Sequence, residues 1–167
     1  MRYYFDNSYK FERNMAMLAS RPKVVANIIG NSLHSEIKGS MRLFQLNNGV
    51  LAAVELFGLP VGNKCANPVF ALHIHEGESC TGNSKDAFAD AKMHYNPDKC
   101  EHPYHAGDLP PLFGNNGYAF QIFFTNRFTL REIIGKTVIV HSKPDDFKTQ
   151  PSGDAGEKIA CGVIRRN

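Results

Sequence analysis

Short apolar runs, many of them alternating with polar residues, recur along the chain from about residue 23 to its end. The run at 35–46 places Ile37, Met41 and Leu43 on one parity, as in a strand with one buried face. Similar runs occupy further stretches: 23–30, 50–60, 68–77, 117–126, 137–142 and 158–165. Almost no long helical period accompanies them, so the pattern predicts an all-β fold.

Turn residues separate these runs. Asn47, Asn48 and Gly49 predict a tight hairpin, because Asn and Gly tolerate the positive φ angles that such turns need. Two longer stretches, 76–117 and 143–157, are rich in turn residues and show little strand pattern. Stretches of that length inside a compact domain are usually functional or disordered. We therefore expect a Greek-key antiparallel β-sandwich or barrel of about eight strands with two long functional loops.

The first twenty residues differ from the rest, since aromatic and charged side chains follow one another there without a clean period. The stretch 11–20 is compatible with a short helix before Pro22 or with a loosely packed extension. The chain therefore divides into an N-terminal extension, residues 1–20, and one domain, residues 21–167.

Composition adds bounds on function. The chain has 167 residues, enough for a full hydrophobic core, and its hydrophobic fraction of 43% is ordinary for a soluble globular protein. A net charge of +3 favours a small anionic substrate but is too weak and dispersed to indicate nucleic acid. No apolar stretch reaches the length of a membrane span, and the N-terminal residues lack the apolar region of a signal peptide. We expect neither a nucleic-acid nor a membrane partner.

Histidines carry the candidate chemistry. His73 and His75 share parity on a predicted strand, so both rings should point to one face. Four more stand in the long stretch after that strand or at the end of a later strand: His94, His102, His105 and His141. His34 lies apart in a predicted loop, and we expect no function for it.

Six convergent imidazoles favour a metal site. Imidazole suits copper and zinc, and Asp108 adds a carboxylate three residues after His105. A hydrolase triad is disfavoured, because no G-x-S-x-G motif is present and six histidines exceed what a triad uses. The H-E-x-x-H motif is also absent, since His75 and Glu76 are followed by Gly-Glu-Ser. So many imidazoles predict two metals, or one metal with a large surrounding shell.

Several segments, taken together, resemble copper/zinc superoxide dismutases. They stand in the family's order between about residue 70 and residue 164: HIHEGESC (73–80), HYNP (94–97), HPYHAGDLP (102–110), IIGKTVIVHSKPDD (133–146) and GDAGEKIACGVI (153–164). The segment LPPLFGNNGYAF (109–120) looks like bacterial members. Any one segment would be weak, but the set in this order is specific to the family.

The resemblance implies a role for each matching residue. It implies four copper ligands: His73, His75, His94 and His141. It implies four zinc ligands, with His94 bridging the two metals: His94, His102, His105 and Asp108. Asp145 matches a carboxylate that hydrogen-bonds one ligand of each metal. Cys80 and Cys161 match the family disulfide.

The implied activity is dismutation of superoxide to dioxygen and hydrogen peroxide, with copper cycling its redox state and zinc organising the site. The alternative is a dismutase-like protein that binds copper and zinc with little or no turnover. Lys158 stands where the family usually has an arginine that guides the anion over copper. Lysine keeps the positive charge but lacks the planar fork of donors, so we expect a working but slower enzyme.

Three features depart from the resemblance or lie outside it. The chain ends in GVIRRN where animal enzymes continue with an apolar tail used in their dimer, so a monomer is favoured. Cys65 and Cys100 could form a second disulfide or stay free, and Cys100 could instead bind zinc. Disulfides favour export, yet no signal segment is visible, so we expect a cytoplasmic protein, with an exported one as the alternative.

Overall fold

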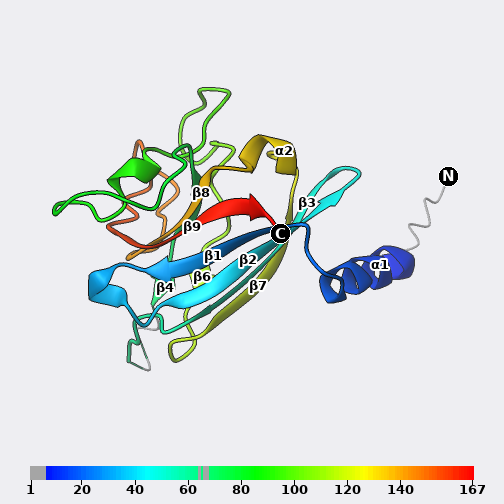
Figure 1. Cartoon of the computed structure of the whole chain (residues 1–167), viewed down its shortest axis with the longest axis horizontal. Helices are drawn as coiled ribbons and strands as arrows, with labels where there is room; N and C mark the ends of the chain where they lie inside the picture. The colour runs from blue at the N-terminus through cyan, green and yellow to red at the C-terminus, as the bar shows by residue number, and fades with distance from the viewer. Residues whose placement is uncertain (1–6, 64, 66–67) are drawn as a thin grey trace.

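The chain folds into a nearly all-β domain whose main sheet curls into a half-barrel (Figure 1). The computed structural model describes residues 7–63, 65 and 68–167. Its elements in chain order are α1 (Asn7–Ala19), β1 (Val24–Gly30), η1 (Ser32–His34), β2 (Lys38–Leu46), β3 (Gly49–Phe57), β4 (Val69–Phe70), β5 (Leu72–His75), η2 (Ala89–Ala91), β6 (Leu112–Phe113), β7 (Ala119–Thr125), α2 (Leu130–Ile133), β8 (Thr137–His141) and β9 (Lys158–Arg166). The predicted all-β fold is confirmed.

The main sheet has seven antiparallel strands in the order β5-β8-β9-β1-β2-β3-β7. A second sheet of two strands, β4 and β6, joins its edges, because β4 leads into β5 and β6 leads by a short turn into β7. We call residues 76–111, between β5 and β6, the first loop, and residues 142–157, between β8 and β9, the second loop. Both loops were predicted, and they lie together at one end of the half-barrel (Figure 1).

The run predicted as one strand at 68–77 is divided between the two sheets at Ala71. The Ala71 N–H donates to the Lys143 carbonyl at 2.8 Å, and the Ala71 carbonyl accepts from the His141 N–H at 2.9 Å. These bonds use the Ala71 backbone at the point where the second loop begins. The chain therefore changes its pairing partner there, from β6 to β8.

Strand alternation builds the core. The predicted parity of Ile37, Met41 and Leu43 is confirmed, since all three side chains are buried. The predicted hairpin is also present, with Leu46 paired to Gly49 across Asn47 and Asn48.

The two α-helices differ in how well the sequence indicated them. The helix α1 covers most of the stretch that was compatible with a helix, and it projects away from the half-barrel (Figure 1). The helix α2 was not predicted, although Thr129 and Glu132 form a capping box that marks its start. The division of the chain into an extension, residues 1–20, and a domain, residues 21–167, stays a prediction. Among the residues that the structure describes, we find no helix long and apolar enough to cross a membrane.

Replacing Met41 by alanine tests the core. Met41 is fully buried, so Met41→Ala should leave a cavity and lower the free energy of unfolding by about 2–5 kcal/mol. Chemical denaturation measures this change. The control is Leu33→Ala, because Leu33 is 83% exposed and its truncation should leave stability nearly unchanged. Equal effects from both variants would contradict the assignment of Met41 to the core.

Candidate metal centre

Two adjacent strands present the first three histidines. His73 and His75 lie on β5, which pairs with β8 so that His73 faces Ile139 and His75 faces Thr137. His141 ends β8 and has the same parity as these partners, so its ring emerges on the same face. All three rings are buried. The predicted common face of His73 and His75 is present.

The first loop returns to the free edge of β5 and brings further ligands with it. His94 forms a β-bridge with His75, and Asp108 forms one with His73. Between them, the Tyr95 N–H donates to the Ile74 carbonyl and the Ile74 N–H donates to the Gly107 carbonyl, both at 2.8 Å. The backbone ladder therefore sets the positions of the loop side chains, although the loop has little regular structure.

The buried side chains form two groups of possible ligands that share His94. Within each group, one nitrogen or oxygen atom per residue lies within 4.8 Å of those of the others. The first group is His73, His75, His94 and His141, and the second is His94, His102, His105 and Asp108. The structure thus brings together every residue that the resemblance implied as a ligand, while His34 belongs to neither group.

Two nitrogens in the first group face each other without a proton between them. The Nδ1–H of His75 donates to the Lys92 carbonyl at 2.9 Å, and that of His141 donates to the Gly156 carbonyl at 3.3 Å. Both Nε2 atoms then carry lone pairs, and they lie 3.2 Å apart. Burial, and next the neighbouring histidines, lowers the pKa of His75 well below its usual value and that of His141 to about 3. Neutral rings in this arrangement repel unless a cation lies between them, so the geometry fits a metal ion.

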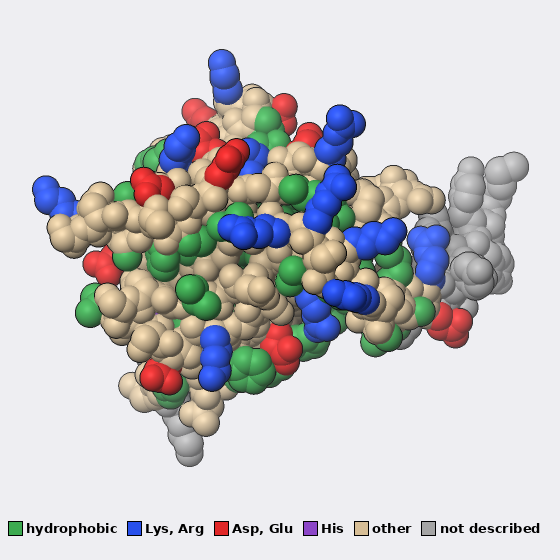
Figure 2. Space-filling model, in the orientation of Figure 1, with side chains coloured by type: hydrophobic (Ala, Val, Ile, Leu, Met, Phe, Trp, Pro, Cys, Tyr) green, Lys and Arg blue, Asp and Glu red, His purple; other side chains and the backbone are tan. Residues whose placement is uncertain are grey.

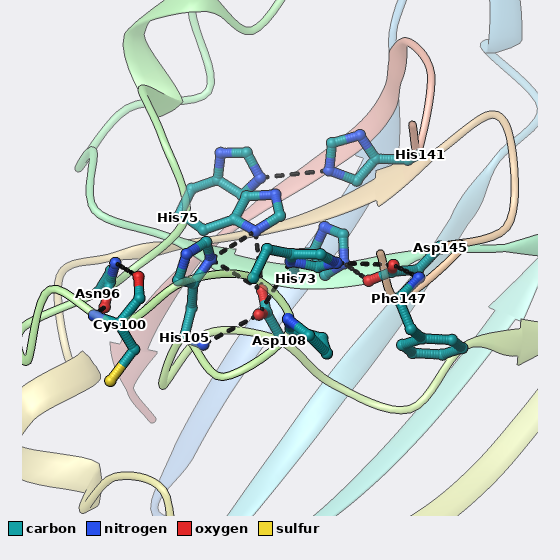
Figure 3. Close-up of polar contacts among 12 residues, drawn as sticks. His73, His75, Asn96, Cys100, His105, Asp108, His141, Asp145 and Phe147 are labelled. Atoms are coloured by element: carbon teal, nitrogen blue, oxygen red, sulfur yellow. Dashed lines mark hydrogen bonds and ion pairs between the residues drawn. The ribbon is translucent and has the colours of Figure 1, made fainter. Parts of the chain in front are cut away.

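Asp145 contacts one histidine of each group (Figure 3). Its Oδ2 accepts from His73 Nε2 at 2.9 Å and its Oδ1 accepts from His102 Nε2 at 2.8 Å. Burial raises the pKa of Asp145, but hydrogen bonds from His73, from the Phe147 N–H and from His102 outweigh it and lower that pKa to about 2. The carboxylate therefore stays ionised and directs the other nitrogen of each ring inward.

The inward nitrogens have no hydrogen-bond partner among the described residues. This holds for three buried atoms: His73 Nδ1, His94 Nε2 and His102 Nδ1. His102 Nδ1 lies 3.0 Å from Asp108 Oδ2 without the angles of a hydrogen bond. A buried polar atom without a partner costs about 1–3 kcal/mol, and a metal ion would remove that cost for each of them. The donor sets, four imidazoles and three imidazoles with one carboxylate, fit copper and zinc.

Asp108 organises the second group. Its Oδ1 lies 2.8 Å from His94 Nδ1 and 3.4 Å from His105 Nδ1, and its Oδ2 accepts from the His105 N–H at 3.0 Å. Burial raises the pKa of Asp108, but contacts with His94 and the other two histidines outweigh it and lower that pKa. An ionised carboxylate among three imidazoles is the donor set expected of a zinc site.

Arg127 fixes the part of the first loop that carries this group, and sequence reasoning missed it. Its Nη1 donates to three backbone carbonyls, those of Pro103 at 3.0 Å, His105 at 3.0 Å and Asp108 at 3.2 Å. The acceptors are main-chain atoms, which any residue supplies, so no pattern in the sequence could have indicated the contact.

The cysteines behave in two ways. Cys80 and Cys161 form the implied disulfide, which joins the first loop to β9. Cys65 and Cys100 are exposed and free in the described part of the chain, so a disulfide between them, which the sequence left open, is absent there. Cys100 is outside both ligand groups, and its sulfur points away from the histidines in Figure 3.

Lys158 pairs with His141 across β9 and β8, beside the first group. Its ammonium donates to Asp86 Oδ2 at 2.7 Å and to the Phe88 carbonyl at 3.1 Å. Its positive charge also contributes, after burial, His73 and His94, to the lowered pKa of His141. The expected cation is therefore near the metal-binding histidines, but it already has an anionic partner that the sequence did not indicate.

Replacing Arg127 by glutamine should weaken metal binding by the second group and leave the first group unchanged. Without the guanidinium, the carbonyls of Pro103, His105 and Asp108 lose their common donor, and we expect zinc affinity to fall about tenfold or more. Competition with a chromophoric chelator measures this affinity. Arg131→Gln, an exposed charge-matched control on α2, should bind zinc as the unaltered protein does. Equal zinc affinity in the two variants would show that Arg127 does not organise the loop.

Replacing Asp145 by asparagine should affect both groups. The amide cannot accept from His73 and His102 at once, because one of its two terminal atoms is a donor. We expect the affinities for copper and for zinc each to fall about 10–100-fold, measured by metal analysis after dialysis against chelators. Loss of only one metal would contradict a shared role for Asp145.

Comparison with known proteins agrees with this geometry. The family described as copper/zinc superoxide dismutase (SODC) matches residues 37–164. The Cu-Zn superoxide dismutase 2 of Aquifex aeolicus is 34% identical over 145 residues, which are 78% of this chain and 80% of the relative. The Cu-Zn superoxide dismutase of Escherichia coli K12 is 33% identical over 161 residues, 88% of this chain and 90% of the relative.

A solved structure extends the likeness to the fold. It is the crystal structure of a double mutant of an SOD-like protein from Bacillus subtilis, which aligns with a TM-score of 0.73 at 28% identity. The alignment covers 84% of this chain and 96% of that one. By its sequence match and by its fold, the chain belongs to the copper/zinc superoxide dismutase family.

Proposed function

We propose that this protein is a superoxide dismutase, an oxidoreductase that converts superoxide to dioxygen and hydrogen peroxide with copper and zinc as cofactors. The observation that carries the proposal is the pair of ligand groups that share His94. Family membership supports it, because relatives at about one-third identity are named Cu-Zn superoxide dismutases.

Each residue offers one nitrogen or oxygen to the group it belongs to, and His94, which belongs to both groups, offers one nitrogen to each. Copper would be held by His73 Nδ1 and by the Nε2 atoms of three rings, His75, His94 and His141. Zinc would be held by the second group: His94, His102, His105 and Asp108. When bound, copper supplies one-electron oxidation and reduction, and zinc supplies a positive charge that has no redox chemistry of its own.

His94 supplies the proton-handling atom in this proposal. Its Nδ1 faces Asp108 in the second group, while its Nε2 is buried without a hydrogen-bond partner in the described part of the chain. Two superoxide anions consume two protons as they become dioxygen and hydrogen peroxide. A ring nitrogen that is free to take a proton and release it again suits that requirement. The His94 Nε2 is the atom that we assign to this role.

The positive charge available to the substrate is local. Lys158 is the cation next to His141, and we propose that it holds the incoming anion. The net charge of the whole chain is only +3. Figure 2 shows Lys and Arg on the face formed by β1, β2 and β9, with Asp and Glu near several of them. This distribution suits a small anion better than a polyanion, so we propose no nucleic-acid partner.

Oligomeric state and compartment are also proposals. For the oligomeric state we propose a monomer. For the compartment we propose the cytoplasm. The Cys80–Cys161 disulfide supports the alternative, export to an oxidising compartment.

The second candidate function is binding of copper and zinc with little or no turnover. The relative from Bacillus subtilis that shares the fold is described as SOD-like. In this chain all four imidazoles of the first group are present and buried, which favours the enzyme.

Replacing His141 by alanine separates the two candidates. Protein that carries both metals should remove superoxide, and His141→Ala should reduce that rate to the level of protein without copper. The variant should keep its zinc, because His141 belongs only to the first group. The measurements are a superoxide assay and metal analysis on the same samples. Fully metallated protein that is no more active than the variant would favour the binding protein.

A further inference from the structure

The ammonium of Lys158 is held by two acceptors from one short segment of the first loop. Asp86 Oδ2 lies 2.7 Å from its nitrogen and the Phe88 carbonyl lies 3.1 Å from it. The Lys158 side chain is only 14% exposed, whereas that of Asp86 is 39% exposed. An ammonium has three N–H donors, so this pairing leaves one of them for another acceptor.

Hydrogen bonds within residues 83–88 hold the Asp86 carboxylate in place independently of Lys158. Its Oδ1 accepts from the Phe88 N–H at 2.9 Å, which leaves Oδ2 for the ammonium. The Asn83 side chain accepts from the Asp86 N–H at 3.2 Å, and the Asn83 N–H donates to the Asp86 carbonyl at 2.9 Å. The local hydrogen bonds therefore position Asp86 to pair with Lys158, which distinguishes it from a flexible surface residue.

The same segment is anchored to the core under Lys158. Phe88 is buried and packs in a small cluster with Ala91, Ile139 and Cys161. Cys161 is three residues beyond Lys158 on β9 and is bonded to Cys80, at the start of the same segment. The ion pair and the disulfide thus connect the same two parts of the chain, residues 80–88 of the first loop and β9.

We propose that Asp86 sets the strength with which Lys158 attracts the anionic substrate, by neutralising the ammonium while it holds it in place. The inference rests on the proposed function, since it concerns how fast superoxide reaches the metal site of the proposed dismutase. Asp86 acts through Lys158, so it is a positioning residue. An ion pair presents no net charge at distances much larger than its own length, so it contributes little to steering a small anion.

Replacing Asp86 by asparagine should expose the charge of Lys158. In fully metallated protein at low ionic strength, we expect kcat/KM for superoxide to rise about threefold, with a steeper decrease on addition of salt. Azide serves as a second probe, because it is a small anion whose binding changes the copper spectrum without turnover. We expect its dissociation constant to fall about threefold as well.

Two controls make the effect specific. Glu12→Gln removes one negative charge from α1, which projects away from the half-barrel, and should change neither quantity. When Lys158→Met is added to Asp86→Asn, the gain should disappear, because the ammonium that Asp86→Asn exposes is then gone. Asp86→Ser provides a second side chain without charge, should the asparagine variant lose metal.

The results that would overturn the proposal are distinct from a failure of the proposed function. Unchanged or weaker azide binding in both Asp86 variants would overturn it, and so would a gain in the Asp86→Asn variant that survives the addition of Lys158→Met. Protein that binds azide as expected but never removes superoxide would instead reject the dismutase activity.

Discussion

The burial of imidazole nitrogens that carry lone pairs is the constraint on which this structure depends. His75 and His141 each use one nitrogen to donate to a backbone carbonyl, and their other nitrogens meet 3.2 Å apart. His73 and His102 each use one nitrogen to donate to Asp145, which leaves their other nitrogen with a lone pair. Without a cation these contacts are unfavourable, because a buried lone pair without a donor loses its hydration and gains nothing. We therefore expect metal binding to stabilise the folded state of this protein.

That constraint explains why the two long loops are ordered by contacts with each other. Gln150 in the second loop donates to the His102 carbonyl at 2.7 Å and accepts from the His102 N–H at 3.0 Å. Asp145, also in the second loop, holds the side chain of the same histidine. Arg127, from the segment after β7, holds the first loop at the carbonyls of His105 and Asp108. Ligands on irregular backbone thus gain the rigidity that strands would otherwise supply.

The sequence predicted the parts of this structure that follow from periodicity. Strand parity was sufficient for the buried face of β2 and for the shared face of His73 and His75, because side chains alternate strictly along a strand. The ligand groups and the disulfide were implied by the resemblance of several motifs to the family. The residues that connect those parts could not be predicted. Arg127 contacts main-chain carbonyls, which any residue supplies. The change of pairing partner at Ala71 depends on backbone contacts with the second loop. Asp86 contacts a lysine that is 72 residues away in the sequence.

In the function that we propose, the anion meets Lys158 where the resemblance implies an arginine. An arginine offers five donors in a planar fork, so it can bind loop carbonyls and still direct other N–H groups outward. Lys158 has three donors, and two of them are used by Asp86 and Phe88. With most of its donors occupied and its charge balanced, the lysine depends on the loop for its placement. The loop is in turn joined to β9 by the Cys80–Cys161 disulfide. If Lys158 holds the anion as we propose, the charge that the anion meets is a property of the disulfide-linked part of the first loop and β9 together, and not of residue 158 alone.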